Sequence, residues 1–296
     1  MSVGNVRYLR MEPSVKSQSD IDGVVDPSLL AHRLLNLSGR VEQHTYSRKL
    51  RLSSIAGVCV RERLIGLRRS ITAEIRVPLG LRVTFDSGTG IHDFMQNTNA
   101  YFGDKRLGWW RCRACGHRQF GTKPKEKCPK CNALKSAFVY SEHSLKLPED
   151  IPVSGHPDMF VNVGPGDIRI ADFKSINGDE FDRLSSPKAE HAIQVVGYMK
   201  YIGLDDTLPI RVNTERGLVI YVSKKHTVKK LPFKAFHVVK SPVFIKLIEN
   251  KVELFKRGLD DETFLPDPET VCVGSKFSCW TAKECPVLSW CIGAYR

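Results

Sequence analysis

The sequence contains no run of about 18 apolar residues, the length that a membrane-spanning helix needs. Charged side chains occur throughout the first 30 residues, so we expect no secretory signal peptide. No internal repeat or low-complexity tract is visible, which leaves a globular domain as the working hypothesis. We therefore expect a cytoplasmic protein, or one of the host cytoplasm if the protein is viral.

Acidic residues are too few to balance the basic ones. The 296 residues include 45 Lys or Arg against 32 Asp or Glu, which gives a formal net charge of +13. A surplus of this size predicts a polyanionic partner, nucleic acid before a membrane surface, with a merely basic protein as the alternative. Hydrophobic residues make up 42% of the chain, enough for one large domain or two small ones, and exclude a wholly disordered protein.

The positive charge is concentrated between residues 105 and 135. Ten of these 31 residues are Lys or Arg and only Glu126 is acidic, so this segment alone carries +9. It resembles a basic insertion into the main domain, and we expect it to contact phosphates. Trp109, Trp110 and Phe120 either stack on bases or pack the insertion against the core. The side chains expected to bind nucleic acid are Arg111, Arg113, Arg118, Lys123 and Lys125.

The same segment carries two cysteine pairs. Cys112-x₂-Cys115 and Cys128-x₂-Cys131 are separated by twelve residues. Two such pairs are typical of a tetrahedral structural zinc site, and a segment with so little apolar core needs a metal to fold. A small iron site of the rubredoxin kind uses similar pairs and is the alternative.

Asp158, Asp172 and Lys174 form a candidate catalytic group. Strand patterns at residues 157–163 and 168–173 flank the turn at residues 164–167, so a hairpin would bring the two carboxylates together. Asp172 and Lys174 share one face of their strand because side chains alternate. Two carboxylates beside a lysine suit Mg²⁺ or Mn²⁺ and phosphodiester hydrolysis, whereas three solvated surface charges are the alternative.

Four short motifs follow one another along the chain. They are His92 on a helix after the loop at residues 88–90, the segment Gly155-His156-Pro157-Asp158, the segment Asp172-Phe173-Lys174, and Gln194 with Tyr198 one turn apart on a helix over residues 187–201. This set resembles the RecB-like branch of the PD-(D/E)XK nuclease superfamily, over roughly residues 50–296 apart from the basic insertion. The resemblance implies an α/β fold with a mixed central sheet flanked by helices.

The resemblance also implies a role for each motif residue. Asp158, Asp172 and His92 would hold the catalytic Mg²⁺ or Mn²⁺, and Lys174 would orient or polarise the attacking water. Gln194 and Tyr198 would position the substrate strand. Glu142, on a preceding strand, is a weaker candidate for the same site.

Five further cysteines suggest a second metal centre. An iron–sulfur subset of RecB-like nucleases, which includes AddB-like and CRISPR-associated exonucleases, binds a 4Fe-4S cluster with one early and three late cysteines. The usual tail, C-x₂-C-x₅-C, is met by Cys285 and Cys291, but position 282 is Ala282. The resemblance implies Cys59, Cys279, Cys285 and Cys291 as ligands, with Cys272 as the alternative to Cys279. A second zinc site and plain buried thiols are the other interpretations.

These predictions divide the chain into four parts. They are an N-terminal arm or accessory helix (1–45), a nuclease core (46–104 and 136–265), the basic zinc ribbon (105–135) and an iron–sulfur staple (266–296 with Cys59). The expected function is that of a metal-dependent DNA exonuclease acting on single-stranded or resected ends in recombination, repair or viral replication. The alternatives are a structure-specific endonuclease and a non-catalytic zinc-ribbon nucleic-acid-binding protein.

Local patterns predict the remaining elements. We expect helices over residues 26–35, 53–67 and 241–257, and strands over residues 138–140, 145–147, 217–222 and 233–239.

Overall fold

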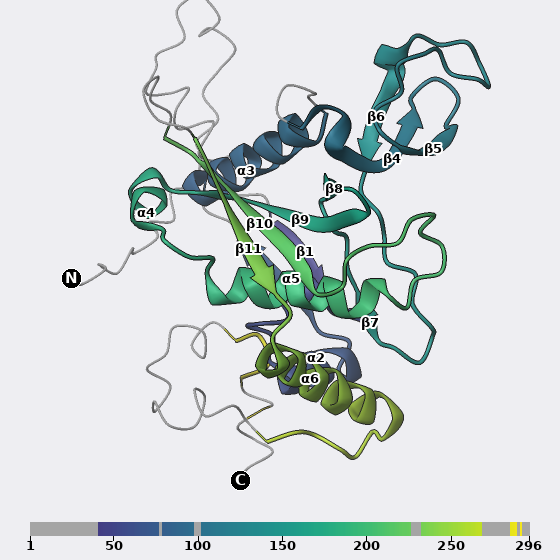
Figure 1. Cartoon of the computed structure of the whole chain (residues 1–296). Coiled ribbons are helices and arrows are strands. Elements are labelled where there is room, and N and C mark those ends of the chain that lie inside the picture. Colours follow the sequence, from purple (N-terminus) through teal and green to yellow (C-terminus); the bar gives the residue numbers. More distant parts are fainter. Residues whose placement is uncertain are drawn as a thin grey trace, which may run out of the picture.

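The structure is a computed structural model that describes residues 41–76, 79–97, 102–225, 232–267, 285–288 and 291. Its centre is a mixed sheet of seven strands in the order β11-β10-β9-β8-β4-β5, with β6 also paired to β4 (Figure 1). Strands β9 and β10 are parallel, and the other neighbours are antiparallel. The strands are β4 (Arg106–Cys112), β5 (Arg118–Gly121), β6 (Phe138–Ser141), β8 (Met159–Gly164), β9 (Asp167–Ile176), β10 (Arg216–Ser223) and β11 (Phe233–Val239).

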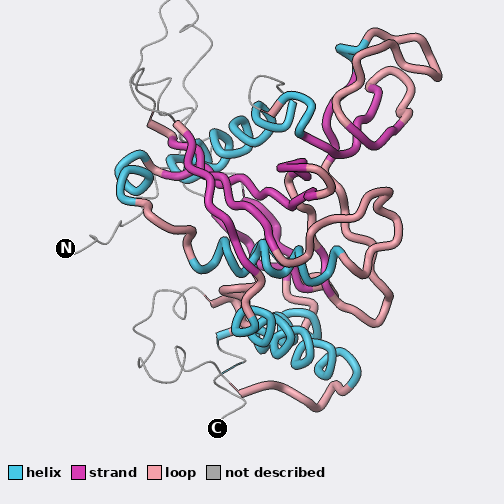
Figure 2. The backbone as a smooth tube through the Cα atoms, viewed as in Figure 1, coloured by secondary structure: helices cyan, strands magenta, loops and turns pink. Residues whose placement is uncertain are grey.

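Helices cover both faces of this sheet, as Figure 2 shows. The helices are α2 (Val60–Arg68), α3 (Leu79–Asn97), α4 (Gly178–Arg183), α5 (Ala189–Ile202) and α6 (Pro242–Asp260). Because side chains alternate along a strand, Ile170 of β9 packs with α5 in one apolar cluster, whereas Phe173 packs with Met95 of α3 in another. The predicted α/β fold, a mixed sheet flanked by helices, is therefore confirmed.

A further layer is formed by α2 and α6, which pack closely against each other. A Cβ atom on Gly258 would lie 2.2 Å from Leu64, so only glycine permits this approach. Arg68 donates to the backbone oxygen of Gly258 in the last turn of α6, where carbonyls have no partner within the helix. It also donates to the oxygens of Asp261 and Phe264, just beyond the helix. Two pairs of short strands lie outside the main sheet: β1 (Val41–Thr45) pairs with β3 (Thr72–Arg76), and β2 (Leu50–Arg51) pairs with β7 (Val153–Ser154).

Most of the predicted elements in the described part of the chain are present, and three differ. The helix expected over residues 53–67 is instead a 3₁₀ turn (Leu52–Ser54) followed by α2, because Cys59 caps a new helix with its sulfur. The loop expected at residues 88–90 is helical, since α3 runs through both of its glycines. Residues 145–147 form no strand. The helix expected over residues 26–35 lies outside the described residues.

None of the helices in the described residues is both long and apolar enough to span a membrane.

Candidate active site and metal centres

Strands β8 and β9 bring the two predicted carboxylates together. Met159 at the start of β8 pairs with Ala171 of β9, so Asp158 lies beside Asp172. Both side chains are buried, with exposed fractions of 8% and 1%. The backbone N–H of Phe173 donates to Asp158 Oδ2 at 2.6 Å, which fixes this carboxylate against the edge of β9.

Helices on opposite faces of the sheet complete the group. From α3, His92 Nδ1 lies 3.5 Å from Asp158 Oδ2. From α5, Gln194 Nε2 donates to Asp172 Oδ1 at 2.9 Å and to the Tyr198 hydroxyl at 3.0 Å. On β9 itself, Lys174 Nζ lies 2.7 Å from Asp172 Oδ2. The six motif residues therefore lie together, although they come from α3, β9, α5 and the residue just before β8, and the backbone N–H of Phe173 links the Asp158 contacts to those of Asp172.

The electrostatics of this cluster favour an added cation. Burial, and then the negative charge of Asp158, raise the pKa of Asp172 to about 7 against the opposing charge of Lys174. Burial alone would lower the pKa of His92, but contact with Asp158 raises it. Asp172 Oδ2 is ion-paired with Lys174 yet makes no hydrogen bond of normal geometry, which leaves a buried lone pair. Carboxylate oxygens are the ligands that Mg²⁺ or Mn²⁺ prefers, but among the described residues only Cys112, Cys115, Cys128 and Cys131 bring three or more donor atoms within 4.8 Å of one another.

Two polar residues near this cluster were not singled out from the sequence. Gln96 donates to Glu142 Oε1 at 2.8 Å and to the Asp158 backbone oxygen at 3.3 Å, and so links Glu142 to the site. Its position four residues after His92 on one helix face was the available signal. Partial burial, and then the charge of Asp158, raise the pKa of Glu142.

His191 is the second such residue, one turn before Gln194 on α5. Its Nδ1 lies 2.7 Å from the Tyr221 hydroxyl, which also accepts from the Lys188 backbone N–H. Burial, and then the charge of Lys174, lower the pKa of His191 to about 4, so this side chain is neutral at pH 7.

The four ribbon cysteines converge on one point. Their sulfur atoms all lie within 4.8 Å of one another, with Cys112–Cys131 at 3.8 Å and Cys115–Cys128 at 3.7 Å. A tetrahedral ion with metal–sulfur bonds of about 2.3 Å requires sulfur–sulfur distances of about 3.8 Å. The chain thus holds a rubredoxin-like four-cysteine site with the geometry for zinc or iron.

Each cysteine pair closes in the same way. The residue after the second cysteine, Gly116 or Asn132, has a positive φ and donates its N–H to the first cysteine's carbonyl at 2.9 Å. Burial alone would raise the pKa of Cys128, but the backbone N–H groups of Lys130 and Cys131 lower it to about 7, which favours the thiolate that a metal needs.

The ribbon aromatics pack against protein. Trp110 is fully buried and donates to the Gly121 oxygen, so of the two alternatives for this residue the structure shows packing against the core. Trp109 lies edge-on to Phe120, with ring centres 5.3 Å apart, and donates to His143 Nδ1. Strand β4 also pairs with β8 at Arg106 and Leu107. The pairing and the aromatic contacts together attach β4 to the main domain.

The five predicted nucleic-acid-binding side chains fall into two groups. Arg111 and Arg118 face each other across β4 and β5, both exposed, and Arg113 is exposed nearby. Lys123 is half-buried and donates to the Asn97 oxygen, whereas Lys125 is exposed and pairs with Asp104 at 2.9 Å. The Arg118 guanidinium also lies over the Trp109 ring, 5.0 Å from the ring centre.

Three of the predicted cluster cysteines, Cys59, Cys285 and Cys291, lie in the described residues. Cys59 caps α2 by accepting from the Glu62 N–H at 3.4 Å. Arg61 donates to Cys291 Sγ at 3.1 Å and to the Pro266 oxygen at 2.8 Å. The pKa of Tyr46 is raised by burial, then by Glu62, and to a smaller extent by Cys285. The end of the chain therefore contacts the helix that Cys59 begins. Cys272 and Cys279 lie outside the described residues.

Comparisons with known proteins add a local match and distant structural likenesses. Residues 110–139 match the family model for the rubredoxin-like domain of rubrerythrin, the segment that carries the four-cysteine site. No curated protein matches the chain.

Several solved structures resemble the fold. An alkaline exonuclease (LHK-Exo) from Laribacter hongkongensis aligns with a TM-score of 0.45 at 14% identity, over 73% of this chain and 90% of that one. The same enzyme in complex with dAMP aligns with a TM-score of 0.43 at 14% identity, over 73% and 89%. The protein SSO0001 aligns with a TM-score of 0.36 at 10% identity, over 90% and 97%.

Proposed function

We propose that this protein is a metal-dependent deoxyribonuclease of the PD-(D/E)XK type, acting as an exonuclease on single-stranded or resected DNA ends in recombination, repair or viral replication. The observation that carries the proposal is that Asp158, Asp172 and Lys174 lie together where β8 and β9 pair. His92 reaches Asp158 from α3, on the face of the sheet opposite to α5. Isolated surface charges would not be buried together in this way, because unpaired buried carboxylates are costly.

Each residue of the cluster has a task that its contacts support. Asp158, Asp172 and His92 would hold Mg²⁺ or Mn²⁺, which when bound stabilises the charge that develops on the phosphate and acidifies a water. The Phe173 N–H and the Gln194 amide hold the two carboxylates in fixed orientations. Lys174, ion-paired to Asp172 but partly exposed, has an ammonium group that can orient the attacking water. Tyr198 holds Gln194 in place from within the helix.

Two structural metal centres accompany this proposal. The ribbon site would hold zinc, as the four-thiolate geometry permits, and Cys59, Cys279, Cys285 and Cys291 would hold a 4Fe-4S cluster. The contact of Arg61 with Cys291 supports the second centre, since it brings the last cysteine to the helix that Cys59 caps.

The proposal predicts that Asp172→Asn abolishes DNA cleavage. The change keeps the size of the side chain but removes the charge that a divalent cation requires, so the rate should fall by about 10²–10³-fold or more. The measurement is degradation of end-labelled linear single-stranded DNA with Mg²⁺ or Mn²⁺. Asp179→Asn, an exposed carboxylate on α4, is the matched control and should cut at the wild-type rate.

Covalently closed single-stranded circles separate an exonuclease from an endonuclease, because only an endonuclease cuts them. Cleavage by Asp172→Asn at the control rate would show that the site is misassigned. No cleavage by a wild-type preparation with its ribbon metal bound would favour a protein that binds DNA without cutting it.

A further inference from the structure

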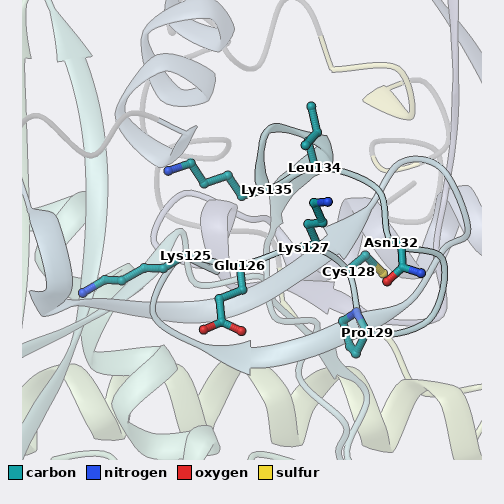
Figure 3. Close-up of a pocket in the computed structure, with 8 residues that line it drawn as sticks. All are labelled: Lys125, Glu126, Lys127, Cys128, Pro129, Asn132, Leu134 and Lys135. Atoms are coloured by element: carbon teal, nitrogen blue, oxygen red, sulfur yellow. The ribbon is translucent and has the colours of Figure 1, made fainter.

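The tip of the ribbon carries a groove that the active site does not use. Two cavities of about 600 and 310 Å³ lie there and share Lys125 and Lys135 in their linings, so they are neighbours and are here named together the ribbon groove. Figure 3 shows the residues that line the larger part, which come from both before and after the Cys128–Cys131 turn. The residues lining the larger part are Lys125, Glu126, Lys127, Cys128, Pro129, Asn132, Leu134 and Lys135, and those lining the smaller part are Lys123, Pro124, Lys125, Lys135 and Ser136.

The lining is strongly positive. Four lysines face one acid, Glu126. Among the described residues, Lys127 and Lys135 have no ion-pair partner, and the exposed pair of Lys125 with Asp104 is of the kind that contributes little free energy. Glu126 and Asp104 together offset only part of the charge of the four lysines, so the groove keeps a net positive lining that an anionic ligand would neutralise.

The groove also has an apolar part. Leu134 is 64% exposed, and it lines the larger cavity together with Pro129. A large exposed apolar side chain among lysines fits a ligand that has both charged and flat apolar parts. Single-stranded DNA has this composition, since its phosphates alternate with unpaired bases. A duplex keeps its bases stacked inside and would leave Leu134 without a contact.

The groove lies close to the proposed active site. Lys123, in its smaller part, donates to the Asn97 oxygen at 2.9 Å, at the last residue of α3. Gln96, the residue before, contacts the Asp158 backbone oxygen. One turn of α3 thus joins the inner end of the groove to the carboxylates, so a strand lying in the groove would run toward them.

We propose that the ribbon groove binds a single-stranded segment of the DNA substrate, with Lys127 and Lys135 on its phosphates and Leu134 against a base. This inference rests on the proposed function for the choice of ligand, but it concerns binding and not cleavage. The ribbon then acts as a holding site that keeps the strand near the carboxylates between successive cuts.

The test is the affinity of fluorescently labelled single-stranded DNA, measured by anisotropy in the Asp172→Asn background so that the strand stays intact. Lys127→Ala with Lys135→Ala should weaken binding about tenfold near physiological salt and reduce the slope of log K against log salt by about 1.4. Leu134→Ala should weaken binding about fivefold without changing that slope, because an apolar contact releases no counterions.

The matched control is Lys130→Ala with Lys246→Ala. Lys130 lies between Cys128 and Cys131, next to residues that line the groove, but does not line it itself. Lys246 is exposed on α6. These variants should bind within about twofold of the parent. Equal losses in control and groove variants would overturn the proposal in favour of diffuse attraction, and unchanged binding in the groove variants would overturn it outright.

Two more results separate this inference from the proposed function. A loss confined to duplex DNA would overturn the assignment to a single strand. If wild-type protein cuts no DNA but the groove variants lose single-strand affinity, the nuclease proposal fails and the groove stands. If cutting is normal and the groove variants bind as the parent does, the groove fails and the nuclease stands.

Discussion

Asp205 is a buried carboxylate whose four hydrogen bonds link the loop after α5 to the base of the ribbon. It accepts from the Lys146 N–H, from the N–H and hydroxyl of Thr207, and from His143 Nε2 at 2.8 Å. Because Trp109 donates to His143 Nδ1, the imidazole proton lies on Nε2 and points at Asp205. Burial alone would raise the pKa of Asp205, but these donors lower it. Asp205→Asn should therefore lower the free energy of unfolding by about 2–3 kcal/mol at pH 7. Because the pKa of Asp205 is lower in the folded state than in the unfolded state, its charge stabilises the folded protein in full at pH values above the unfolded pKa of about 4. This stabilisation is lost as the pH falls through the pKa of the folded state. Urea unfolding at pH 7 and below pH 4 checks this, with the exposed neighbour Asp206→Asn as control; an equal difference between parent and variant at both pH values would contradict it. At this scale the sequence identified Asp158, Asp172 and Lys174 but not Asp205, since two of its three partner residues, His143 and Lys146, lie more than 50 residues away.

The four-cysteine site is the feature that decides the stability of the ribbon as an element. The ribbon has few apolar side chains of its own, and both cysteine pairs depend on a left-handed residue, Gly116 or Asn132. Cys112→Ser should release the metal and unfold the ribbon, because a three-thiolate site binds the ion much more weakly. The measurement is zinc and iron content by elemental analysis together with the near-ultraviolet circular dichroism of Trp109 and Trp110. Gly116→Val, which adds a strained side chain at a φ of 75°, should weaken metal binding while all four thiols remain. Gly164→Ala, at an open turn with nothing within 4 Å, is the control, and a metal-free but fully folded Cys112→Ser ribbon would contradict the prediction. Strand and helix patterns predicted β10, β11 and α6 closely, because each has clear periodicity or a cap such as Ser241. They failed at residues 145–147, where the backbone of Leu145 and Lys146 bonds to Gly155 and Asp205 in place of a neighbouring strand.

On the scale of the whole molecule, the C-terminal part of the described chain meets α2 near the other end of the sequence. Arg61 contacts Cys291 and Pro266 across more than 200 residues of sequence, and Arg68 holds the end of α6. If Cys59 and Cys291 share a 4Fe-4S cluster, Cys59→Ser should remove the iron and its broad visible absorbance while the ribbon metal stays bound. The midpoint of thermal unfolding should fall as well, because a link that closes a long loop restricts the unfolded chain. Anaerobically purified protein, with iron and zinc counted per chain, is the material for this measurement. Cys272→Ser and Cys279→Ser, compared side by side, identify the third tail ligand, since only the true ligand should lose iron. A wild-type protein without iron would contradict the cluster and favour buried thiols or a second zinc site.

The sequence by itself determined the chemistry of this protein: its surplus of positive charge, its paired cysteines, and the order of the carboxylate, lysine and glutamine motifs. These features could be found because each depends on spacing within a short segment, where the period of a strand or helix fixes which side chains lie together. The tertiary structure alone decided which distant segments meet. Placing His92 and Gln194 on opposite faces of one sheet, burying Trp110, bringing Gln96 between Glu142 and Asp158, and opening the ribbon groove all depend on the packing of elements far apart in sequence. No local pattern encodes such contacts, because their free energy comes from the burial of surfaces that exist only once the sheet and its helices have assembled.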